Sequence, residues 1–438
     1  MDFKEVFKKY QEDIIRHTKE LVSFPSVLVE NEVVNGVTYR FGIENKKALD
    51  YILNLGHELG FKTHNVENVC GHIEYGEGDE VLAVLCHVDV VPAIGSWTRP
   101  PFECYEKDGK LFGRGTIDDK GPAITTLYAL KAIKDLGLPL KKKIRLIFGT
   151  DEESGSRGLA RYLQVMEKPK YGISPDANFP IIYGEKGILS IKFSAKNDTD
   201  IIAKGGVRLN VVAPFVDFET NNEEIKKLYN GKLHVDGISA HAMEPDNGKN
   251  AIKEFALSIK PFVKSKFIDF ICDNLINTRL KDCSLDITDV EMGDLTMNMG
   301  ILEMNKDEAS LYINIRYPHN LDYPKFIKDF SAVANKYGVK LDVLSNNKPH
   351  YINPNTPFIK KLHASYKKYT NDDTPLMTIG GGTYARELEC GVAYGVNFPG
   401  EVEMAHETDE YATISSLMLA GTILMDAMYN LCKDEKWD

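Results

Sequence analysis

Two side chains able to bind a metal stand close together in the first quarter of the chain, at His87 and Asp89. His87 is the last of residues 81–87, and Asp89 comes two positions later. This stretch is an apolar run without polar alternation, which is typical of a strand buried on both faces. Side chains two residues apart on a strand point to the same side, and sites in open α/β sheets collect at the carboxyl ends of strands. We therefore interpret His87 as a candidate metal ligand and Asp89 as the carboxylate that orients its ring, with a solvated strand end as the alternative.

Asp118 and Asp119 form the second candidate group. They lie in a glycine-flanked turn before a helix predicted over residues 123–136, whose first turn Pro122 suits. One interpretation is N-terminal capping of that helix, because aspartate is favoured there. An N-terminal cap needs only one acid, so a functional role for this pair of acids is an equal alternative.

Two glutamates, Glu152 and Glu153, follow a second buried-type strand over residues 143–149. Neighbouring side chains at a strand end point in different directions, so one glutamate can bind a metal while the other faces a substrate. The alternative is an ordinary charged loop. Asp176 and His406 stand in further loops of the chain.

Each of these residues is a weak signal alone, but together they make a ligand set. Two histidines and several carboxylates suit a pair of zinc or similar divalent ions. Two metals bridged by one carboxylate can polarise a carbonyl and generate hydroxide near neutral pH, with a free glutamate as general base. The set consists of His87, Asp89, Asp118, Glu152, Glu153, Asp176 and His406.

The elements that must position this set fall into two predicted domains. Residues 1–186 and 355–438 carry buried-type strands and helices, which predicts an α/β catalytic domain with a mostly parallel sheet covered by helices. Residues 187–354 alternate apolar and polar side chains between helices, which predicts an inserted α+β domain with an antiparallel sheet. Helices are predicted over residues 3–22, 44–59, 123–136, 248–264, 324–337, 357–369 and 412–431.

The composition of the 438 residues, 43% hydrophobic and 27% charged, is ordinary for a soluble globular protein. A net charge of −11 argues against a nucleic-acid partner, since phosphate binding needs a basic surface. No apolar run approaches the ~20 residues that cross a bilayer, and the N-terminus lacks the apolar core of a signal peptide. Seven scattered cysteines without a Cys-x-x-Cys pair indicate reduced thiols, so we expect a cytoplasmic protein with no membrane partner.

Several motifs, taken in chain order, resemble those of the M20 family of dinuclear metallopeptidases. They are His-Val-Asp-Val-Val-Pro (87–92), Gly-Arg-Gly-Thr-Ile-Asp-Asp-Lys-Gly (113–121), Thr-Asp-Glu-Glu-Ser-Gly (150–155), Ser-Pro-Asp-Ala (174–177) and Ser-Ala-His-Ala (239–242). Gly-Gly-Gly-Thr-Tyr-Ala-Arg (380–386) is similar to the branch of PepV-type bacterial dipeptidases, relatives of carnosinase. The motifs cover nearly the whole chain.

The resemblance implies a role for each residue of the ligand set. Asp89 would orient His87, and Glu152 would be the general base. The peptide bond after the bridging acid is cis in relatives, which predicts a cis bond between Asp118 and Asp119. The resemblance implies two divalent ions, zinc with manganese or cobalt as alternatives. The implied ligands are His87 and Asp176 on one ion, Glu153 and His406 on the other, and Asp118 between them.

The resemblance also implies that the inserted domain is a lid. His241 would stabilise the oxyanion, and Asn210 would contact the substrate. Arg316 would grip a C-terminal carboxylate in a bidentate manner. A glycine-rich turn with Gly381, Gly382 and Thr383 would assist. An enlarged lid implies a site completed within one chain, so we expect a monomer.

The implied activity is metal-dependent hydrolysis of the peptide bond of dipeptides with free termini. Three alternatives stay open on the sequence alone. The first is a deacylase acting on N-acyl amino acids, because the same chemistry serves both reactions. The second is a non-catalytic relative that binds peptides, and the third is a structural protein without metal.

Overall fold

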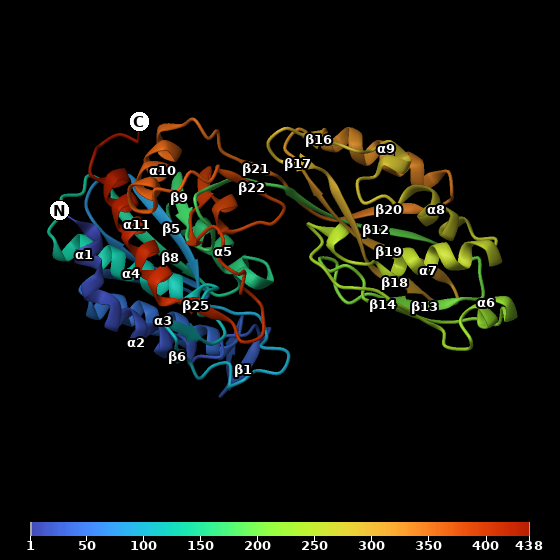
Figure 1. Ribbon diagram of the computed structural model, residues 1–438, viewed down its shortest axis with the longest axis horizontal. Helices are drawn as coiled ribbons and strands as arrows, with labels where there is room; N and C mark the ends of the chain where they lie inside the picture. Colours follow the sequence, from blue (N-terminus) through green and yellow to red (C-terminus); the bar gives the residue numbers. More distant parts are fainter. Residues whose placement is uncertain (1, 438) are drawn as a thin grey trace. The chain divides into compact units, whose positions relative to one another are not determined.

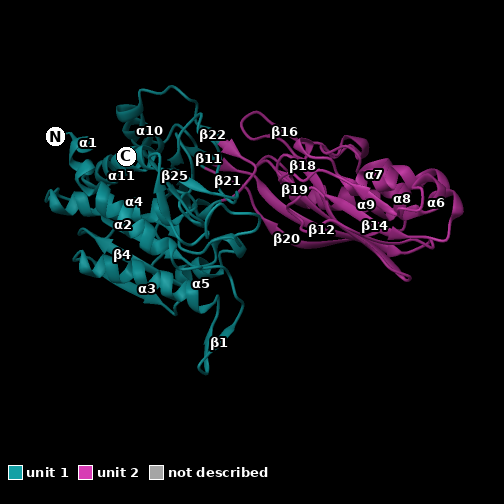
Figure 2. Ribbon diagram, turned by 60° about the horizontal axis from the view of Figure 1, so that its bottom comes forward, with its two compact units in different colours: residues 1–183, 352–377, 383–438 teal, residues 184–351, 378–382 magenta. Residues whose placement is uncertain are grey.

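The computed structural model describes residues 2–437 and divides into two compact units. Unit 1 comprises Met1–Tyr183, Ile352–Met377 and Thr383–Asp438, and unit 2 comprises Gly184–Tyr351 and Thr378–Gly382 (Figure 2). The main boundaries lie three residues before those expected from the sequence. The structure also differs at residues 378–382, which join unit 2 although the sequence analysis assigned them to the catalytic domain.

Unit 1 is built on a mixed β-sheet (Figure 1). Its four central strands, in the order β23-β9-β5-β8, are parallel, and antiparallel strands flank them on both sides. The α/β class is confirmed, with the parallel pairing confined to the middle of the sheet. The strands are β3 (Lys62–Val66), β4 (Cys70–Tyr75), β5 (Val81–His87), β8 (Lys143–Gly149), β9 (Tyr171–Ser174), β23 (Cys390–Ala393) and β11 (Ile182–Glu185).

The central strand β5 is buried at each of its residues, as its unbroken apolar run predicts. Ala83 and Leu85 belong to a cluster with Leu159 of α5 and Tyr384, so alternation along the strand brings His87 to the same face. The helices of unit 1 are α1 (Phe3–Phe7), α2 (Gln11–Val22), α3 (Ile43–Glu58), α4 (Lys120–Asp135), α5 (Arg157–Val165), α10 (Pro357–Thr370) and α11 (Ile414–Cys432).

The helix α11 packs against α4, α10 and α1. Among residues 2–437 it is the one helix whose length and apolar composition would suffice to cross a membrane. The sequence analysis predicted this helix over residues 412–431 and found no uninterrupted apolar run of ~20 residues in it. Within the protein 61% of the most apolar window of α11 is buried, as is usual for a core helix.

Unit 2 contains a seven-stranded antiparallel sheet in the order β15-β14-β13-β18-β19-β12-β20. Aromatic rings of Phe193, Phe270 and Phe330 meet edge to face in its core. The strands are β12 (Gly187–Lys196), β13 (Ile202–Gly205), β14 (Phe215–Glu219), β15 (His234–Asp236), β18 (Thr296–Met304), β19 (Glu308–Tyr317) and β20 (Lys340–Asn347).

The helices of unit 2 match the two predicted segments in part. The structure has helices α7 and α9 there, and it adds α6 and α8, which the sequence analysis did not predict. Their bounds are α6 (Glu223–Leu228), α7 (Ala251–Ile259), α8 (Lys266–Asn274) and α9 (Tyr323–Asn335).

Short strands complete both units. The strand β25 pairs with β7, which pairs with β6, and this small sheet brings the segment after His406 beside the segment before Asp118. The short strands are β1 (Glu32–Val34), β2 (Val37–Tyr39), β6 (Tyr105–Lys107), β7 (Lys110–Phe112), β10 (Ala177–Asn178), β16 (Thr288–Asp289), β17 (Gly293–Asp294), β21 (His350–Tyr351), β22 (Met377–Ile379), β24 (Val396–Asn397) and β25 (Tyr411–Thr413).

Candidate metal centre

The imidazole of His87 is held in one orientation at the end of β5. Its Nδ1 lies 3.0 Å from the carbonyl oxygen of Asp89 and 3.4 Å from a carboxylate oxygen of the same residue. Donation from Nδ1 to that carbonyl leaves Nε2 as the atom that can bind a metal. The other carboxylate oxygen of Asp89 accepts a hydrogen bond from the main-chain N–H of Glu153, at 3.2 Å.

The carboxylate of Asp118 lies between two histidines. Its Oδ1 is 3.0 Å from Nε2 of His87, and its Oδ2 is 3.0 Å from Nε2 of His406. The two histidines come from segments more than 300 residues apart, and one carboxylate faces both of them. This is the arrangement that a carboxylate bridging two cations requires.

The neighbouring Asp119 does not cap α4. The helix N-cap makes no side-chain hydrogen bond, and Oδ2 of Asp119 instead accepts from the main-chain N–H of His87, at 2.9 Å. The capping interpretation is therefore wrong for this pair of acids. The peptide bond between Asp118 and Asp119 is cis.

A second carboxylate accompanies each histidine. Oδ2 of Asp176 is 3.3 Å from Nε2 of His87, and Oε1 of Glu153 is 3.0 Å from Nε2 of His406. The result is two histidine–carboxylate pairs that share Asp118.

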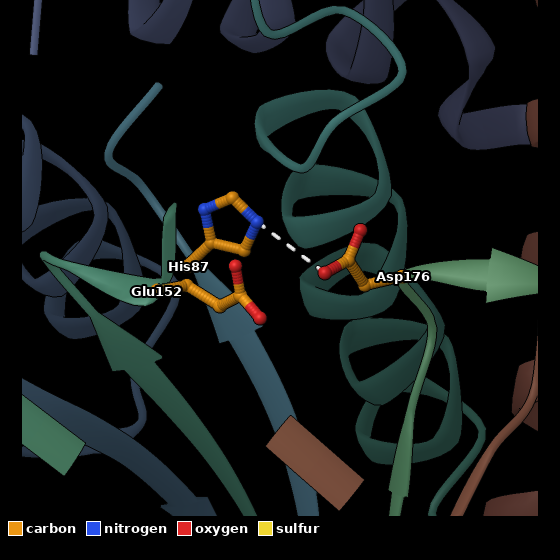
Figure 3. A group of neighbouring side chains, drawn as sticks. All are labelled: His87, Glu152 and Asp176. Atoms are coloured by element: carbon orange, nitrogen blue, oxygen red, sulfur yellow. Dashed lines mark ion pairs between the residues drawn. The ribbon is translucent and has the colours of Figure 1, made fainter. Parts of the chain in front are cut away.

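Glu152 lies beside the first of these pairs, in the short 3₁₀ turn Glu152–Ser154 that follows β8. One potential ligand atom each from His87, Glu152 and Asp176 falls within 4.8 Å of the others (Figure 3). A second such group consists of His87, Asp118 and Glu153. Within the part of the chain that the structure describes, no hydrogen bond or ion pair holds the Glu152 carboxylate.

Burial and mutual repulsion raise the pKa of most carboxyls in this cluster. Burial, with the neighbouring charge of Asp118, raises the pKa of Glu153 to about 7 and that of Asp176 to about 6. Burial also raises the pKa of Glu152 well above its ordinary value, and the charges of Asp176 and Glu153 add to this effect.

The pKa values of the two histidines are raised as well, in their case because carboxylates surround them. Hydrogen bonds to Asp118 and Glu153 raise the pKa of His406 to about 11. Burial lowers the pKa of His87, but the charge of Asp176 and the contacts with Asp118 outweigh it and leave that pKa well above the usual range. Burial alone would raise the pKa of Asp118, yet the two histidines hold it well below its ordinary value.

The donor set fits divalent cations. Nε2 of His87 is fully buried and has no hydrogen-bond partner among residues 2–437, although carboxylate oxygens lie 3.0 and 3.3 Å away. An orphaned nitrogen aimed at carboxylates, in a cluster with an excess of buried acids, is what a metal ion would satisfy. Imidazole nitrogen and carboxylate oxygen suit zinc, and they also accept manganese and cobalt.

The structure shows supporting residues that the sequence analysis missed. Tyr384 is fully buried, and its ring meets that of His87 edge to face with 6.2 Å between centroids. Glu410 and Arg114 are fully buried beside Asp118 and form an ion pair. Tyr384 stands in the motif that carried the family resemblance, which was a usable signal, whereas Glu410 had none.

Asn210 and His241, two candidate residues of unit 2, lie side by side. The backbone of Val211 pairs with that of His241, and the N–H of Ala242 donates to the carbonyl of Asn210 at 3.0 Å. The side chains of Asn210 and His241 are both exposed. Nδ1 of His241 accepts a hydrogen bond from the N–H of Met243, at 3.2 Å.

Arg316, on β19, is buried and bonds to two protein oxygens. Its Nε donates to Oδ1 of Asn314 at 2.7 Å, and its Nη1 donates to the carbonyl of Gly380 at 2.8 Å. Gly381 and Gly382 follow in the same unit, and Thr383 begins the return to unit 1. The hydroxyl of Thr383 accepts from the N–H of Ala385, which caps a 3₁₀ turn. These two hydrogen bonds hold the guanidinium of Arg316 within unit 2.

The fold and the cluster together define a class, the metal-dependent peptidases. Two solved structures of dipeptidases share the fold over nearly the whole chain. Human carnosine dipeptidase 1 matches with a TM-score of 0.62 and 16% identity, covering 98% of each chain. The dipeptidase Dug1p of Saccharomyces cerevisiae matches with a TM-score of 0.65 and 14% identity, covering 99% of each.

The sequence comparisons identify the family. Residues 83–430 match the model of the peptidase family M20/M25/M40, and the chain belongs to this family of metal-dependent hydrolases. A protein of Bacillus subtilis named "Putative dipeptidase YtjP" is 38% identical, over 98% of this chain and 99% of its own. The M20 resemblance that the motifs indicated is thereby confirmed, as is the expectation that the protein is a peptidase.

Proposed function

We propose that the protein hydrolyses the peptide bond of dipeptides with free termini at a centre of two divalent metal ions. The observation that carries the proposal is the placement of Asp118, with one carboxylate oxygen 3.0 Å from each of two histidines. The names of the similar proteins support dipeptides as the substrate class.

In this proposal each histidine and its neighbouring carboxylate hold one ion. His87 and Asp176 would hold one ion, Glu153 and His406 the other, and Asp118 would contribute one oxygen to each. Zinc is the expected metal, with manganese and cobalt as alternatives. When bound, two such ions polarise a carbonyl group and lower the pKa of a water molecule.

We assign Glu152 as the general base and acid. Its carboxylate lies within 4.8 Å of the His87 and Asp176 ligand atoms, and no hydrogen bond or ion pair of the described chain engages it. Burial raises its pKa, so the carboxylate can take a proton from the attacking water and return it to the leaving amine. Asp89 keeps Nε2 of His87 directed at the metal by accepting from Nδ1.

We assign the recognition of the substrate to unit 2. Because Nδ1 of His241 accepts a hydrogen bond, its proton sits on Nε2, where the exposed ring can donate to an oxyanion. Asn210 presents an exposed amide beside it. Arg316 is proposed to bind the C-terminal carboxylate of the substrate, with support from Gly381, Gly382 and Thr383. We expect one chain to suffice, so that the enzyme works as a monomer.

The experiment that tests the proposal is a comparison of substrates with added Mn²⁺ or Zn²⁺. Free dipeptides, the same dipeptides amidated at the C-terminus, N-acetylated dipeptides and N-acyl amino acids would be supplied in parallel. We expect free dipeptides to be cleaved much faster than the others. Preference for N-acyl amino acids would establish a deacylase instead, and binding without cleavage of any substrate would establish a non-catalytic relative.

A further inference from the structure

The buried ion pair of Arg114 and Glu410 contacts the backbone of two candidate ligands, Asp118 and His406. We propose that these two residues are a positioning pair, which holds the Asp118 loop and the His406 loop at the separation that the second metal ion requires. The inference rests on the proposed dinuclear site and adds two residues to it. Neither of them is a metal ligand.

Glu410 organises the backbone that presents Asp118. The residue is fully buried, and its Oε1 accepts hydrogen bonds from the N–H groups of Gly115 at 2.9 Å, Ile117 at 3.0 Å and Asp118 at 3.4 Å. Three N–H groups converging on one carboxylate oxygen fix the course of this loop. The direction in which Asp118 leaves the loop therefore depends on Glu410.

Arg114 extends the same connection to His406. Its Nη1 donates to Oε2 of Glu410 at 2.5 Å, and its Nη2 donates to the main-chain carbonyl of His406 at 3.1 Å. The guanidinium is 1% exposed and lies over the ring of Trp97, 5.2 Å from its centroid. One planar group thus joins the carboxylate that shapes the Asp118 loop to the backbone of the opposite ligand.

The His406 loop needs such a connection. The side chain of His406 is 53% exposed and its φ of 68° lies in the left-handed region, so neither burial nor regular structure fixes the residue. Further along this loop, Asp409 accepts hydrogen bonds from the N–H and hydroxyl of Thr98, at 2.8 and 2.7 Å. Whereas Asp118 and Glu153 contact the ring of His406, the bond from Arg114 acts on its backbone.

The test uses Arg114→Lys in the full-length protein after removal of metal. Lysine keeps the buried positive charge beside Glu410, but a single ammonium does not reproduce the planar fork that reaches two oxygens. Calorimetric titration with Co²⁺ alone gives the affinity of each ion, and the visible absorption of Co²⁺ reports its coordination. We expect two ions per chain in the wild type and a 10–100-fold loss in the weaker affinity in the variant, roughly the effect of losing a supporting contact.

Turnover separates a positioning role from a catalytic one. Because all five ligands and Glu152 remain, kcat of Arg114→Lys should approach the wild-type value at saturating Co²⁺, with KM for the dipeptide unchanged. A second variant, Glu410→Gln, keeps the shape of the side chain but removes its charge. It should weaken Co²⁺ binding as well, and it serves as the test if Arg114→Lys does not fold.

Arg145 and Glu74 provide a matched control. They form another largely buried ion pair of unit 1, with Nη2 of Arg145 2.7 Å from Oε2 of Glu74, and the pair links β8 to β4 without touching a candidate ligand. Arg145→Lys should leave both Co²⁺ affinities at the wild-type level even if it lowers the melting temperature as much as Arg114→Lys does.

The outcomes distinguish the inference from the proposed function. A wild-type protein that binds no Co²⁺, or only one ion, contradicts the dinuclear proposal. Two ions in the wild type, together with unchanged affinities in Arg114→Lys and Glu410→Gln, overturn the positioning pair alone. An equal loss of affinity in Arg145→Lys also overturns it, because general destabilisation would then explain the effect.

Discussion

The two histidines of the candidate metal centre sit in very different surroundings. His87 ends a buried strand, is completely inaccessible to solvent, and has both its ring and its backbone fixed by Asp89 and Asp119. His406 lies on a loop with 53% of its side chain exposed, and Arg114 donates a hydrogen bond to its backbone. The His87 half of the centre is therefore part of the sheet, whereas the His406 half lies on an exposed loop.

The difference implies unequal affinities for the two ions. A ligand that is already fixed loses little freedom when it binds a metal, whereas an exposed loop must be ordered at that moment. We expect the ion at His87 and Asp176 to bind tightly and the ion at His406 and Glu153 to exchange more readily. The tightly bound ion at His87 would keep the site in place, and the activity would then depend on how much metal is available to fill the His406 position.

The largest effects are expected at the two adjacent glutamates. Glu152 lies beside the His87 half of the centre, and Glu153 belongs to the His406 half. Glu152→Ala should lower kcat by about 10²–10⁴-fold and leave both ions bound, since Glu152 is assigned as base. Glu153→Ala should instead lose the ion at His406 and, with it, most activity. Measuring the metal content and the kcat of both variants tests these two assignments. Loss of an ion in Glu152→Ala with two ions retained in Glu153→Ala would reverse the assignment.

His241→Ala tests the contribution of unit 2 with both halves of the centre intact. Loss of one oxyanion donor should lower kcat by about 10²–10³-fold, while both ions stay bound. Mixing this variant with Glu152→Ala, under conditions that allow subunit exchange, examines the assembly. Recovery of activity in the mixture would show that His241 acts across a dimer, and the expectation of a monomer would then be wrong.

Replacing each histidine in turn sharpens the comparison between the halves. His406→Ala should bind one ion with nearly wild-type affinity, because the His87 half does not depend on the loop. His87→Ala should weaken both ions and lower the melting temperature of the metal-loaded protein, because it removes a buried ligand next to Asp118. Calorimetric titration with Mn²⁺ measures both effects, and equal behaviour of the two variants would contradict the asymmetry.

The smallest expected effect is a pH dependence of stability in the metal-free protein. Burial raises the pKa of Glu153 to about 7 and that of Asp176 to about 6, from ordinary values of 4.5 and 3.8. A folded-state pKa raised above the unfolded value means that the folded protein holds the proton more tightly. The resulting stability is fully present below the unfolded pKa and is lost as pH rises through the folded pKa.

We therefore expect these two residues to destabilise the metal-free protein as the pH rises from about 4 to about 7. Bound Mn²⁺ should remove the effect, because the carboxylates then face a cation. Thermal unfolding of the wild type and of Glu153→Gln across this range isolates the contribution of Glu153. A wild type that loses no more stability than the variant would contradict the shift.

Local patterns predicted one half of the site better than the other. The unbroken apolar run before His87 predicts a buried strand, as the structure shows. The two-residue spacing predicts that Asp89 contacts the His87 ring, and the hydrogen bond of Nδ1 is to the main-chain carbonyl of Asp89, with its carboxylate 3.4 Å away. The hydrogen bond from Arg114 to the backbone of His406 had no local signal, because 292 residues separate them and only the folded backbone brings them together.

The division into two units likewise depends in part on long-range contacts that local sequence patterns do not predict. Alternation of apolar and polar residues predicts the antiparallel sheet of unit 2. It does not predict that residues 378–382 join this unit, because they do so through long-range contacts, such as the bond from Lys186 N–H to the carbonyl of Ile379 at 2.9 Å. The helices α6 and α8 were missed since they are short, with six and nine residues, and their periodicity is weak evidence at that length.

We infer that the carboxylate of Asp118 joins two metal sites of unequal affinity. Anomalous diffraction from crystals soaked at a low and then a high concentration of Mn²⁺ would locate each ion. We expect one ion beside His87 and Asp176 at the low concentration, and a second beside His406 and Glu153 at the high one, with an oxygen of Asp118 on each. A single ion at every concentration, filling of the His406 site first, or two ions that Asp118 does not bridge would contradict it.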